Sequence, residues 1–235
     1  MIVAIEGIDG AGKNTLTQAL VAALTATGRP VSRLAFPRYD VEPLGPAVRA
    51  MLTGDQALAS VAASVRASAL LFALDRANAG PELAAAAAGD AVVLVDRYVA
   101  SNAAYGAARL SAPERPGFRD WVASIELIDL ALPRPDLQIL LRVPVEVARA
   151  QARARAALDA SRAPDRYEAD DALQARVAAE YDELARSGWI ARWLTVDRAP
   201  APTTPAAPGT PAAAGDDPRA GSVGAAVEEV LRNLR

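Results

Sequence analysis

A single lysine, Lys13, stands at the end of a glycine-rich segment near the start of the chain, and the other basic residues are all arginines. An apolar, β-branched run at 2–6 precedes the segment, and Leu16 and Leu20 follow it at helical spacing. A glycine loop between a buried strand and a helix lets backbone N–H groups and the helix N-terminus face phosphate oxygens. A lysine there adds a compact positive charge on a thin stem, which the wider guanidinium of arginine does not replace. These residues predict a phosphate-binding P-loop, although Asn14 stands where serine or threonine is usual.

A carboxylate and an arginine, Asp96 and Arg97, follow the second strongly apolar run, 92–95. A carboxylate at the end of a buried strand beside a P-loop is placed like the Walker B acid that assists magnesium. Arginine follows it here, where many motor ATPases have glutamate, and this favours phosphoryl transfer to a small acceptor. A salt bridge at the end of the strand is the alternative interpretation of this pair.

The composition excludes several kinds of chemistry. With no cysteine and no histidine, the chain has no disulfide, no zinc site built on those residues, no cysteine nucleophile and no histidine base. A formal net charge of −3 provides no basic field for nucleic acid or an anionic membrane. Glu6 and Asp9 interrupt the N-terminal apolar run, and no uncharged apolar run reaches about 18 residues. We therefore expect a cytoplasmic protein with no nucleic-acid or membrane partner.

Strand-like and helix-like segments alternate along the chain. The expected strands are 2–6, 31–36, 91–95, 137–143 and 192–196, and helical patterns lie at about 43–53, 57–88, 98–109, 114–131, 145–156 and 169–187. This order predicts an α/β fold, in which a five-stranded parallel sheet has helices on both faces. Ligands of such a sheet bind across the carboxyl ends of its strands.

The chain divides into three segments by composition. Residues 1–198 hold all of these elements and form the predicted main domain. Residues 199–221 are almost entirely Ala, Pro, Thr, Gly and Asp, so they cannot bury a core and predict a disordered linker. Regularly spaced apolar residues predict a short amphipathic helix within 222–235, which we expect to dock back on the sheet.

Several motifs resemble those of the thymidylate kinase family. They are Gly12-Lys13-Asn14-Thr15, Phe36-Pro37-Arg38-Tyr39, Leu71-Phe72-Ala73-Leu74-Asp75-Arg76, Asp96-Arg97-Tyr98, Ser101-Asn102-Ala103-Ala104-Tyr105 and Asp165-Arg166-Tyr167-Glu168. In order and spacing they are most similar to the actinobacterial branch, over about residues 1–198, although Gly106 stands where that family usually has glutamine. The resemblance implies a nucleoside-monophosphate-kinase-like fold with 1–198 as a P-loop kinase domain. It also implies transfer of the γ-phosphoryl of ATP to dTMP in dTTP biosynthesis.

The resemblance further implies the residues of both substrate sites. Phe72 stacks on the thymine ring, and Arg76 and Asn102 contact the edge of the base. The implied dTMP site comprises Asp9, Phe36, Arg38, Tyr39, Phe72, Arg76, Arg97, Asn102, Tyr105, Asp165 and Tyr167. The implied ATP site comprises Gly7, Gly10, Ala11, Gly12, Lys13, Asn14, Thr15, Arg149 and Arg153, and the implied catalytic residues are Lys13, Arg97, Asp9 and Arg153.

The segment at about 147–166 corresponds to the family's lid, which carries arginines toward the transferring phosphoryl group. Arg149 and Arg153 share a helix face, where like charges repel by a few tenths of a kcal/mol unless a polyphosphate binds. Because the P-loop has Ala11 and no arginine, we expect the catalytic arginine to come from the lid. The resemblance also implies Mg²⁺ as cofactor, linked to Asp9 and Glu168, and a homodimer.

A P-loop also occurs in proteins with three other kinds of function. Another P-loop nucleotide or deoxynucleoside kinase is the nearest alternative, and a non-catalytic nucleotide-binding module is the more distant one. A regulatory GTPase needs an Asn-Lys-x-Asp motif for guanine, and the sole lysine of the chain already lies in the P-loop. The sequence therefore argues against a GTPase.

Overall fold

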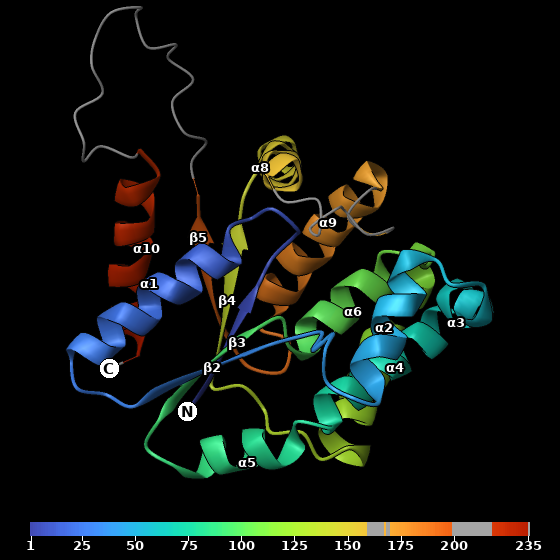
Figure 1. Cartoon of the computed structure of the whole chain (residues 1–235), viewed down its shortest axis with the longest axis horizontal. Coiled ribbons are helices and arrows are strands. Elements are labelled where there is room, and N and C mark those ends of the chain that lie inside the picture. Colours follow the sequence, from blue (N-terminus) through green and yellow to red (C-terminus); the bar gives the residue numbers. More distant parts are fainter. Residues whose placement is uncertain (159–166, 168–169, 199–217, 235) are drawn as a thin grey trace, which may run out of the picture.

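A parallel sheet of five strands lies at the centre of the described chain (Figure 1). The computed structural model describes the backbone of residues 1–158, 167, 170–198 and 218–234. In the order β2-β3-β1-β4-β5, the strands are β1 (Ile2–Glu6), β2 (Val31–Ala35), β3 (Val92–Asp96), β4 (Leu137–Arg142) and β5 (Arg192–Asp197), each parallel to its neighbour. The predicted α/β fold is confirmed, and each strand lies within one residue of its predicted bounds.

Helices cover both faces of this sheet (Figure 1). On one face α1 (Lys13–Ala26) lies beside α10 (Pro218–Asn233), and on the other α6 (Val99–Ala107) lies beside α9 (Asp171–Ser187), with α7 (Arg115–Ser124) packed on α6. At the carboxyl ends of the strands lies α8 (Val145–Leu158), and α2 (Leu44–Thr53) packs near α4 (Val65–Ala77) beyond α6. The carboxyl edge of the sheet is therefore bordered by α8 on one side and by α2 and α4 on the other.

The predicted helical stretch 57–88 is not one helix, and that expectation was wrong. It is divided into η1 (Gln56–Leu58), α3 (Ala59–Ala63), α4 and α5 (Gly80–Ala88). Ser64 has extended backbone, and its Oγ accepts a hydrogen bond from the N–H of Ala67 at 3.2 Å, so it acts as the N-cap of α4. Pro81 lies in the first turn of α5, where its missing N–H costs no hydrogen bond. Both residues begin helices here, although their alanine-rich surroundings read as continuous.

The C-terminal helix also differs from its prediction. It begins at Pro218, four residues before the predicted start, and it packs against α1. Ala226 and Val230 of α10 are 5% and 0% exposed, and Leu234 just after the helix is 5% exposed, so this face of the C-terminal segment belongs to the core. Residues 199–217 of the predicted linker lie outside the described residues, and the division into domain, linker and helix stays a prediction.

The most buried strands, β1 and β3, lie next to each other and are apolar almost throughout. Each fully buried Val, Leu or Ile contributes about 1.5–3 kcal/mol relative to an exposed position, so the centre of the sheet is its most stable part. In the register of the pair, Ile5 lies opposite Asp96. The P-loop that follows β1 and the Asp96-Arg97 pair that ends β3 therefore emerge side by side.

No single helix in the described ranges is long and apolar enough to cross a membrane. Two consecutive segments, Gln56–Ala63 and Val65–Ala77, are together long and apolar enough for a membrane span by length and composition alone, but the chain bends by 105° between them.

Candidate active site

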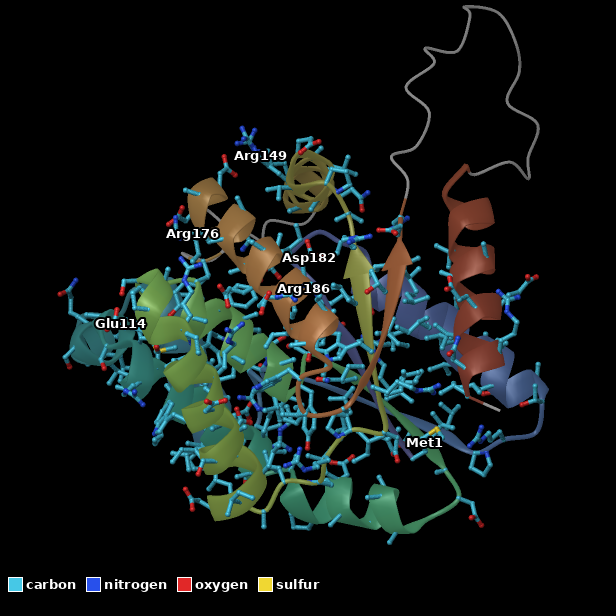
Figure 2. The ribbon with its side chains drawn as sticks, turned by 180° about the vertical axis from the view of Figure 1, so that it is seen from behind. Met1, Glu114, Arg149, Arg176, Asp182 and Arg186 are labelled. Carbon is cyan, nitrogen blue, oxygen red and sulfur yellow. The ribbon has the colours of Figure 1, made fainter. Side chains whose placement is uncertain are left out.

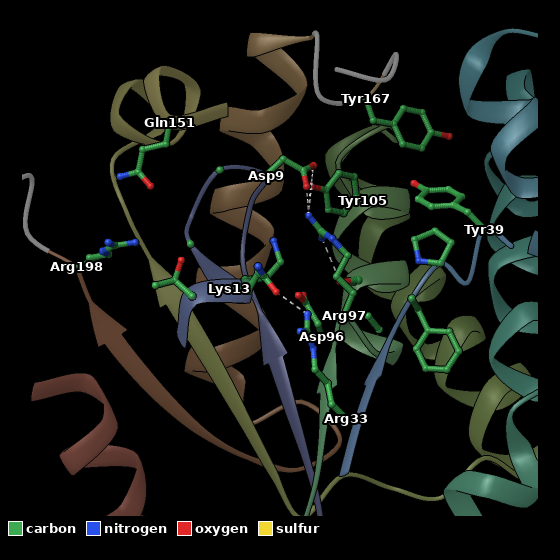
Figure 3. A pocket seen from close by; sticks show the side chains of 18 of the residues that line it. Asp9, Lys13, Arg33, Tyr39, Asp96, Arg97, Tyr105, Gln151, Tyr167 and Arg198 are labelled. Carbon is green, nitrogen blue, oxygen red and sulfur yellow. Dashed lines mark hydrogen bonds and ion pairs between the residues drawn. The ribbon is translucent and has the colours of Figure 1, made fainter. Parts of the chain in front are cut away.

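A cleft of about 1220 Å³ opens at the carboxyl ends of the strands (Figure 3). Its walls come from the P-loop, the ends of β2 and β3, and helices α4, α6, α8 and α10. Of the residues singled out from the sequence, it brings together Asp9, Gly10, Gly12, Lys13, Asn14, Thr15, Phe36, Tyr39, Phe72, Arg76, Arg97, Asn102, Tyr105 and Tyr167. The phosphate-binding residues and the expected base-binding residues therefore face one continuous space.

The P-loop is held in its shape by glycines that other residues could not replace. Gly10 and Gly12 have φ values of 83° and 95°, in the left-handed region that favours glycine. A Cβ atom on Gly10 would lie 1.9 Å from the carbonyl oxygen of Ala148, in the first turn of α8. The loop is therefore packed directly against α8, which carries the predicted lid.

Lys13 lies beneath the loop with its side chain 7% exposed. Its Nζ donates to the carbonyl oxygens of Gly7 at 3.0 Å and Ile8 at 2.9 Å. Burial, followed by the positive charge of Arg97, lowers the pKa of Lys13 from 10.5 to about 8, against the opposing attraction of nearby carboxylates. An anionic ligand at this position would restore a high pKa, because it would favour the charged ammonium.

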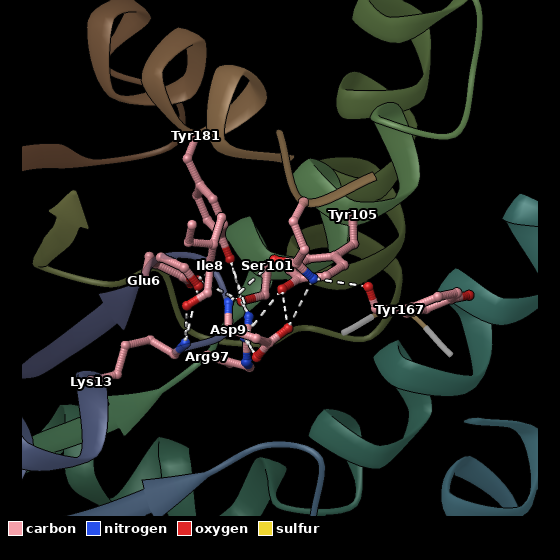
Figure 4. Close-up of polar contacts among 11 residues, drawn as sticks. Glu6, Ile8, Asp9, Lys13, Arg97, Ser101, Tyr105, Tyr167 and Tyr181 are labelled. Atoms are coloured by element: carbon pink, nitrogen blue, oxygen red, sulfur yellow. Dashed lines mark hydrogen bonds and ion pairs between the residues drawn. The ribbon is translucent and has the colours of Figure 1, made fainter. Parts of the chain in front are cut away.

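Asp9 is the centre of a polar cluster above Lys13 (Figure 4). Its carboxylate pairs with the guanidinium of Arg97 and accepts hydrogen bonds from Tyr105 Oη at 2.5 Å and Gln174 Nε2 at 3.3 Å. Burial alone would raise the pKa of Asp9, but the charges of Arg97 and Lys13 and the bond from Tyr105 bring it down to about 2. Asp9 is thus a permanent carboxylate at neutral pH, suited to orienting cations and unsuited to taking up a proton.

Arg97 is positioned by a strained backbone and a buried acid. Its φ of 65° is unusual for a residue with a side chain and places its guanidinium in the cleft. Glu6, fully buried at the end of β1, accepts from Ser101 Oγ at 2.6 Å and from the N–H of Tyr98 at 2.9 Å. Burial raises the pKa of Glu6 in spite of these bonds. Glu6 therefore fixes the turn between β3 and α6, and with it the position of Arg97.

The other end of the cleft is apolar on its walls and polar at its base. Phe36 and Phe72 line it together with Leu52 and Tyr39. Arg76 also lines this end and is 3% exposed. A flat ring with a polar edge fits such a space, because aromatic walls contact its faces while the arginine reaches its edge.

Some predicted site residues do not face the cleft. Gly7 and Ala11 contribute backbone carbonyls to Lys13 and Arg198. Arg38 is turned toward Asp75, donating to its carbonyl at 2.9 Å. Arg149 pairs with Asp171 at 2.7 Å at the outer edge of the molecule (Figure 2), and Arg153 is exposed on α8. Asp165 and Glu168 lie outside the described residues.

The lid helix presents different residues to the cleft than the sequence predicted. Gln151 and Ala154 of α8 line it, whereas Arg149 and Arg153 do not. The i, i+4 spacing correctly placed the two arginines on one helix face, but nothing in that spacing says which face meets the P-loop. Arg149 and Arg153 therefore lie away from the cleft.

Other cleft residues were not among the predicted site. Arg33 of β2 donates to Asn14 Oδ1 at 2.7 Å, and Arg198 after β5 points toward the P-loop (Figure 3). Val223, Gly224 and Val227 of α10 form an apolar part of the wall. The position of Arg198 at a strand end was a usable signal, because the carboxyl ends of parallel strands meet at one edge.

Two carboxylates, Asp9 and Asp96, line the described cleft. No cluster of three or more acidic, cysteine or histidine side chains suited to a metal occurs in the described part of the chain. Magnesium bound with a nucleotide needs fewer protein ligands, since it keeps several waters and phosphate oxygens and takes one or two carboxylates. Asp9 and Asp96 fit such an ion.

Comparisons with known proteins agree with this geometry. The family model described as thymidylate kinase matches residues 5–200. The chain is 48% identical over 196 residues to a thymidylate kinase of Mycobacterium tuberculosis, covering 83% of this chain and 91% of that protein. It is 34% identical over 206 residues to a thymidylate kinase of Solidesulfovibrio magneticus, covering 86% and 93%. It is also 34% identical over 188 residues to a thymidylate kinase of Bordetella pertussis, which covers 79% of this chain and 81% of that protein. The sequence motifs, the parallel sheet and these matches lead to one conclusion: the chain belongs to the thymidylate kinase family.

Proposed function

We propose that the protein transfers the γ-phosphoryl group of ATP to dTMP, giving ADP and dTDP. The observation that carries this proposal is the single cleft that joins the P-loop to the aromatic pocket, with Arg97 between them. A nucleotide-binding scaffold without catalysis would not need both ends connected through a guanidinium. Family membership supports the same reaction.

The donor site is the P-loop side of the cleft. Backbone N–H groups of the loop and the N-terminus of α1 bind the phosphates of ATP, and Lys13 leaves its carbonyl partners to contact the β- and γ-phosphates. Arg33 and Arg198 add positive charge at the rim. The apolar side chains of Val223 and Val227 on α10 contact the less polar part of the nucleotide.

The acceptor site is the pocket between β2, α4 and α6. Phe36 and Phe72 hold the faces of thymine, and Arg76 and Asn102 meet its edge. Tyr105 packs below the deoxyribose, and Arg97 binds the 5′-phosphate. Tyr39 and Tyr167, which are drawn on the same side of the cleft in Figure 3, narrow the pocket on that side.

The transfer itself needs no general base. An oxygen of the dTMP phosphate is already ionised, so it forms the new bond to the γ-phosphorus while the bond to the β-phosphate oxygen breaks and ADP leaves. The work of the protein is positioning and charge neutralisation. Lys13 and Arg97 supply positive charge, and Asp9, with a pKa of about 2, keeps Arg97 oriented without taking up a proton.

Magnesium fits this site and would be held by Asp9 and Asp96 together with phosphate oxygens and water. When bound, it neutralises charge on the β- and γ-phosphates. The sequence-based assignment of Arg153 to catalysis would require the lid to close over ATP. The assignment of Glu168 to this ion stays a prediction.

We further infer a cytoplasmic homodimer that binds neither nucleic acid nor membrane. Ile128 and Leu74 are large hydrophobic side chains that are 67% and 40% exposed. They lie on two elements in mutual contact, the π-helical turn η3 (Ile125–Asp129) and α4. An apolar surface of this kind is what a second copy of the chain would cover. Light scattering during gel filtration measures the mass, and a monomer at micromolar concentration would contradict the dimer.

The function is tested by following ADP formation in a coupled assay with ATP and magnesium, with dTMP added or omitted. The proposal expects ADP to form only when dTMP is present. Equal ADP formation without dTMP would indicate an ATPase, and activity with another monophosphate alone would indicate a different kinase of the same fold.

A further inference from the structure

A buried glutamate lies behind the base-binding end of the cleft. Glu126 belongs to η3 and is 0% exposed. Its Oε2 accepts from Arg76 Nε at 2.5 Å, and its Oε1 accepts from Arg76 Nη2 at 2.7 Å and from Asn102 Nδ2 at 2.7 Å. Arg76 and Asn102 line the cleft, whereas Glu126 does not. One carboxylate outside the cleft therefore holds both polar side chains at the edge of the pocket.

These hydrogen bonds leave Asn102 only its side-chain oxygen and leave Arg76 only N–H donors for a ligand. Asn102 Nδ2 donates to Glu126 and also to the carbonyl oxygen of Ala69 at 2.9 Å, so both amide hydrogens are used. Two acceptors around one atom also identify that atom as nitrogen, and the remaining atom, Oδ1, as oxygen. Arg76 uses the hydrogen of Nε and one hydrogen of Nη2 on Glu126, and its remaining hydrogens, on Nη1 and Nη2, are all donors. Asn102 thus offers an acceptor and Arg76 a donor.

A donor beside an acceptor matches one class of pyrimidine. Thymine and uracil have a carbonyl at position 4 and an N–H at position 3, which pair with a donor and an acceptor. Cytosine has an amino group and an unprotonated nitrogen at the same positions, so both contacts would be mismatched. Sites built to hydrogen-bond one partner reject analogues with unpaired groups by roughly 10⁴-fold or more, because buried polar groups are left unsatisfied.

We propose that Glu126 is the positioning residue that makes this site select thymine and uracil over cytosine, by holding Arg76 as donor and Asn102 as acceptor. The proposal rests on dTMP being the acceptor. A carboxylate is required because three donors converge on it, and a carboxamide offers only one oxygen. The π-helical turn fits this role, since such turns occur often at functional sites.

The test is the variant Glu126→Gln, assayed for kcat/KM with dTMP, dUMP and dCMP. Its carboxamide must direct an N–H group at Arg76 or Asn102, so one of them turns. We expect the dTMP-to-dCMP ratio to fall at least ~10-fold and the KM for dTMP to rise. The dTMP-to-dUMP ratio should stay within about twofold, because those bases differ only by a methyl group away from this edge. The KM for ATP should not change. A purely structural defect would lower kcat/KM by the same factor for all three monophosphates.

Glu180→Gln is the matched control. Glu180 is 4% exposed, pairs with Arg115 at 3.0 Å, and does not line the cleft, so its loss should leave both ratios as in the parent. If Glu126→Gln does not fold in a thermal unfolding assay, Asn102→Ala replaces it, because that variant keeps the Arg76–Glu126 pair. It should also lower the dTMP-to-dCMP ratio ~10-fold or more.

An unchanged dTMP-to-dCMP ratio in a folded Glu126→Gln variant, or in Asn102→Ala where that variant stands in for it, overturns the role of Glu126. In that case a selective, active parent leaves the proposed function intact. A parent enzyme that does not phosphorylate dTMP overturns the function and this inference together.

Discussion

Raising the pH should weaken nucleotide binding through one group, Lys13. Because the chain has no histidine and no cysteine, Lys13 is the side chain expected to titrate near pH 8. Burial and Arg97 lower the pKa of Lys13 to about 8, and bound phosphates favour its charged form. Nucleotide binding therefore takes up a proton, and affinity falls as the pH rises through about 8. The protonated fraction drops from ~0.76 at about pH 7.5 to ~0.03 at about pH 9.5, which predicts a roughly 25-fold weaker Kd.

The assay is calorimetric titration with ADP and magnesium, which avoids turnover. Titrations in two buffers of different ionisation enthalpy report proton uptake, and we expect about half a proton per ADP near pH 8. Lys13→Arg is the control, because a guanidinium stays protonated up to about pH 12, well above the range of the titration. Its affinity, however weak, should not vary over this range. A parent Kd constant to within about twofold from pH 7.5 to 9.5, with no proton uptake, would show that Lys13 does not titrate in this range.

Three further changes test other parts of the site. Lys13→Arg should lower kcat at least ~100-fold despite the retained charge, because the guanidinium is too wide for the loop; turnover within about threefold of the parent contradicts this. Gly10→Ala should raise the KM for ATP at least ~10-fold, since its Cβ would meet the Ala148 carbonyl, whereas Gly28→Ala, which has a similar φ but meets nothing within 4 Å, should not. Ending the chain at Arg198 removes the buried face and the cleft wall of α10, so we expect a stability loss of roughly 3–6 kcal/mol in urea unfolding and a higher KM for ATP. Equal stability with and without α10 would show that its packing on α1 is marginal.

The three central strands, β1, β3 and β4, were predictable because each is a short, largely apolar run buried on both faces. The edge strands β2 and β5 are partly exposed and carry a weaker apolar pattern. The breaks at Ser64 and before Pro81 were harder to recognise, since both residues lie in alanine-rich surroundings that read as helix throughout. The start of α10 at Pro218 was missed for a related reason, because its first turn has the composition of the linker. Local composition thus identified the elements better than their boundaries.

The P-loop was recognisable because its chemistry lies within consecutive residues. Glu126 and Gln174 were not, because their partners Arg76 and Asp9 lie 50 and 165 positions away. A single sequence contains no signal for such pairings. The orientation of α8 was also unpredictable from the sequence, because it depends on tertiary packing. The contact between Gly10 and Ala148 shows which side of that helix meets the loop.

The central claim is that this cleft transfers a phosphoryl group between two nucleotides. The most direct measurement mixes the enzyme with magnesium, dTMP and ATP labelled at the γ-phosphate, and then follows the label chromatographically. We expect the label to appear in the β-phosphate of dTDP, with one ADP formed for each dTDP. Label recovered only as inorganic phosphate, with dTMP unchanged, would contradict it.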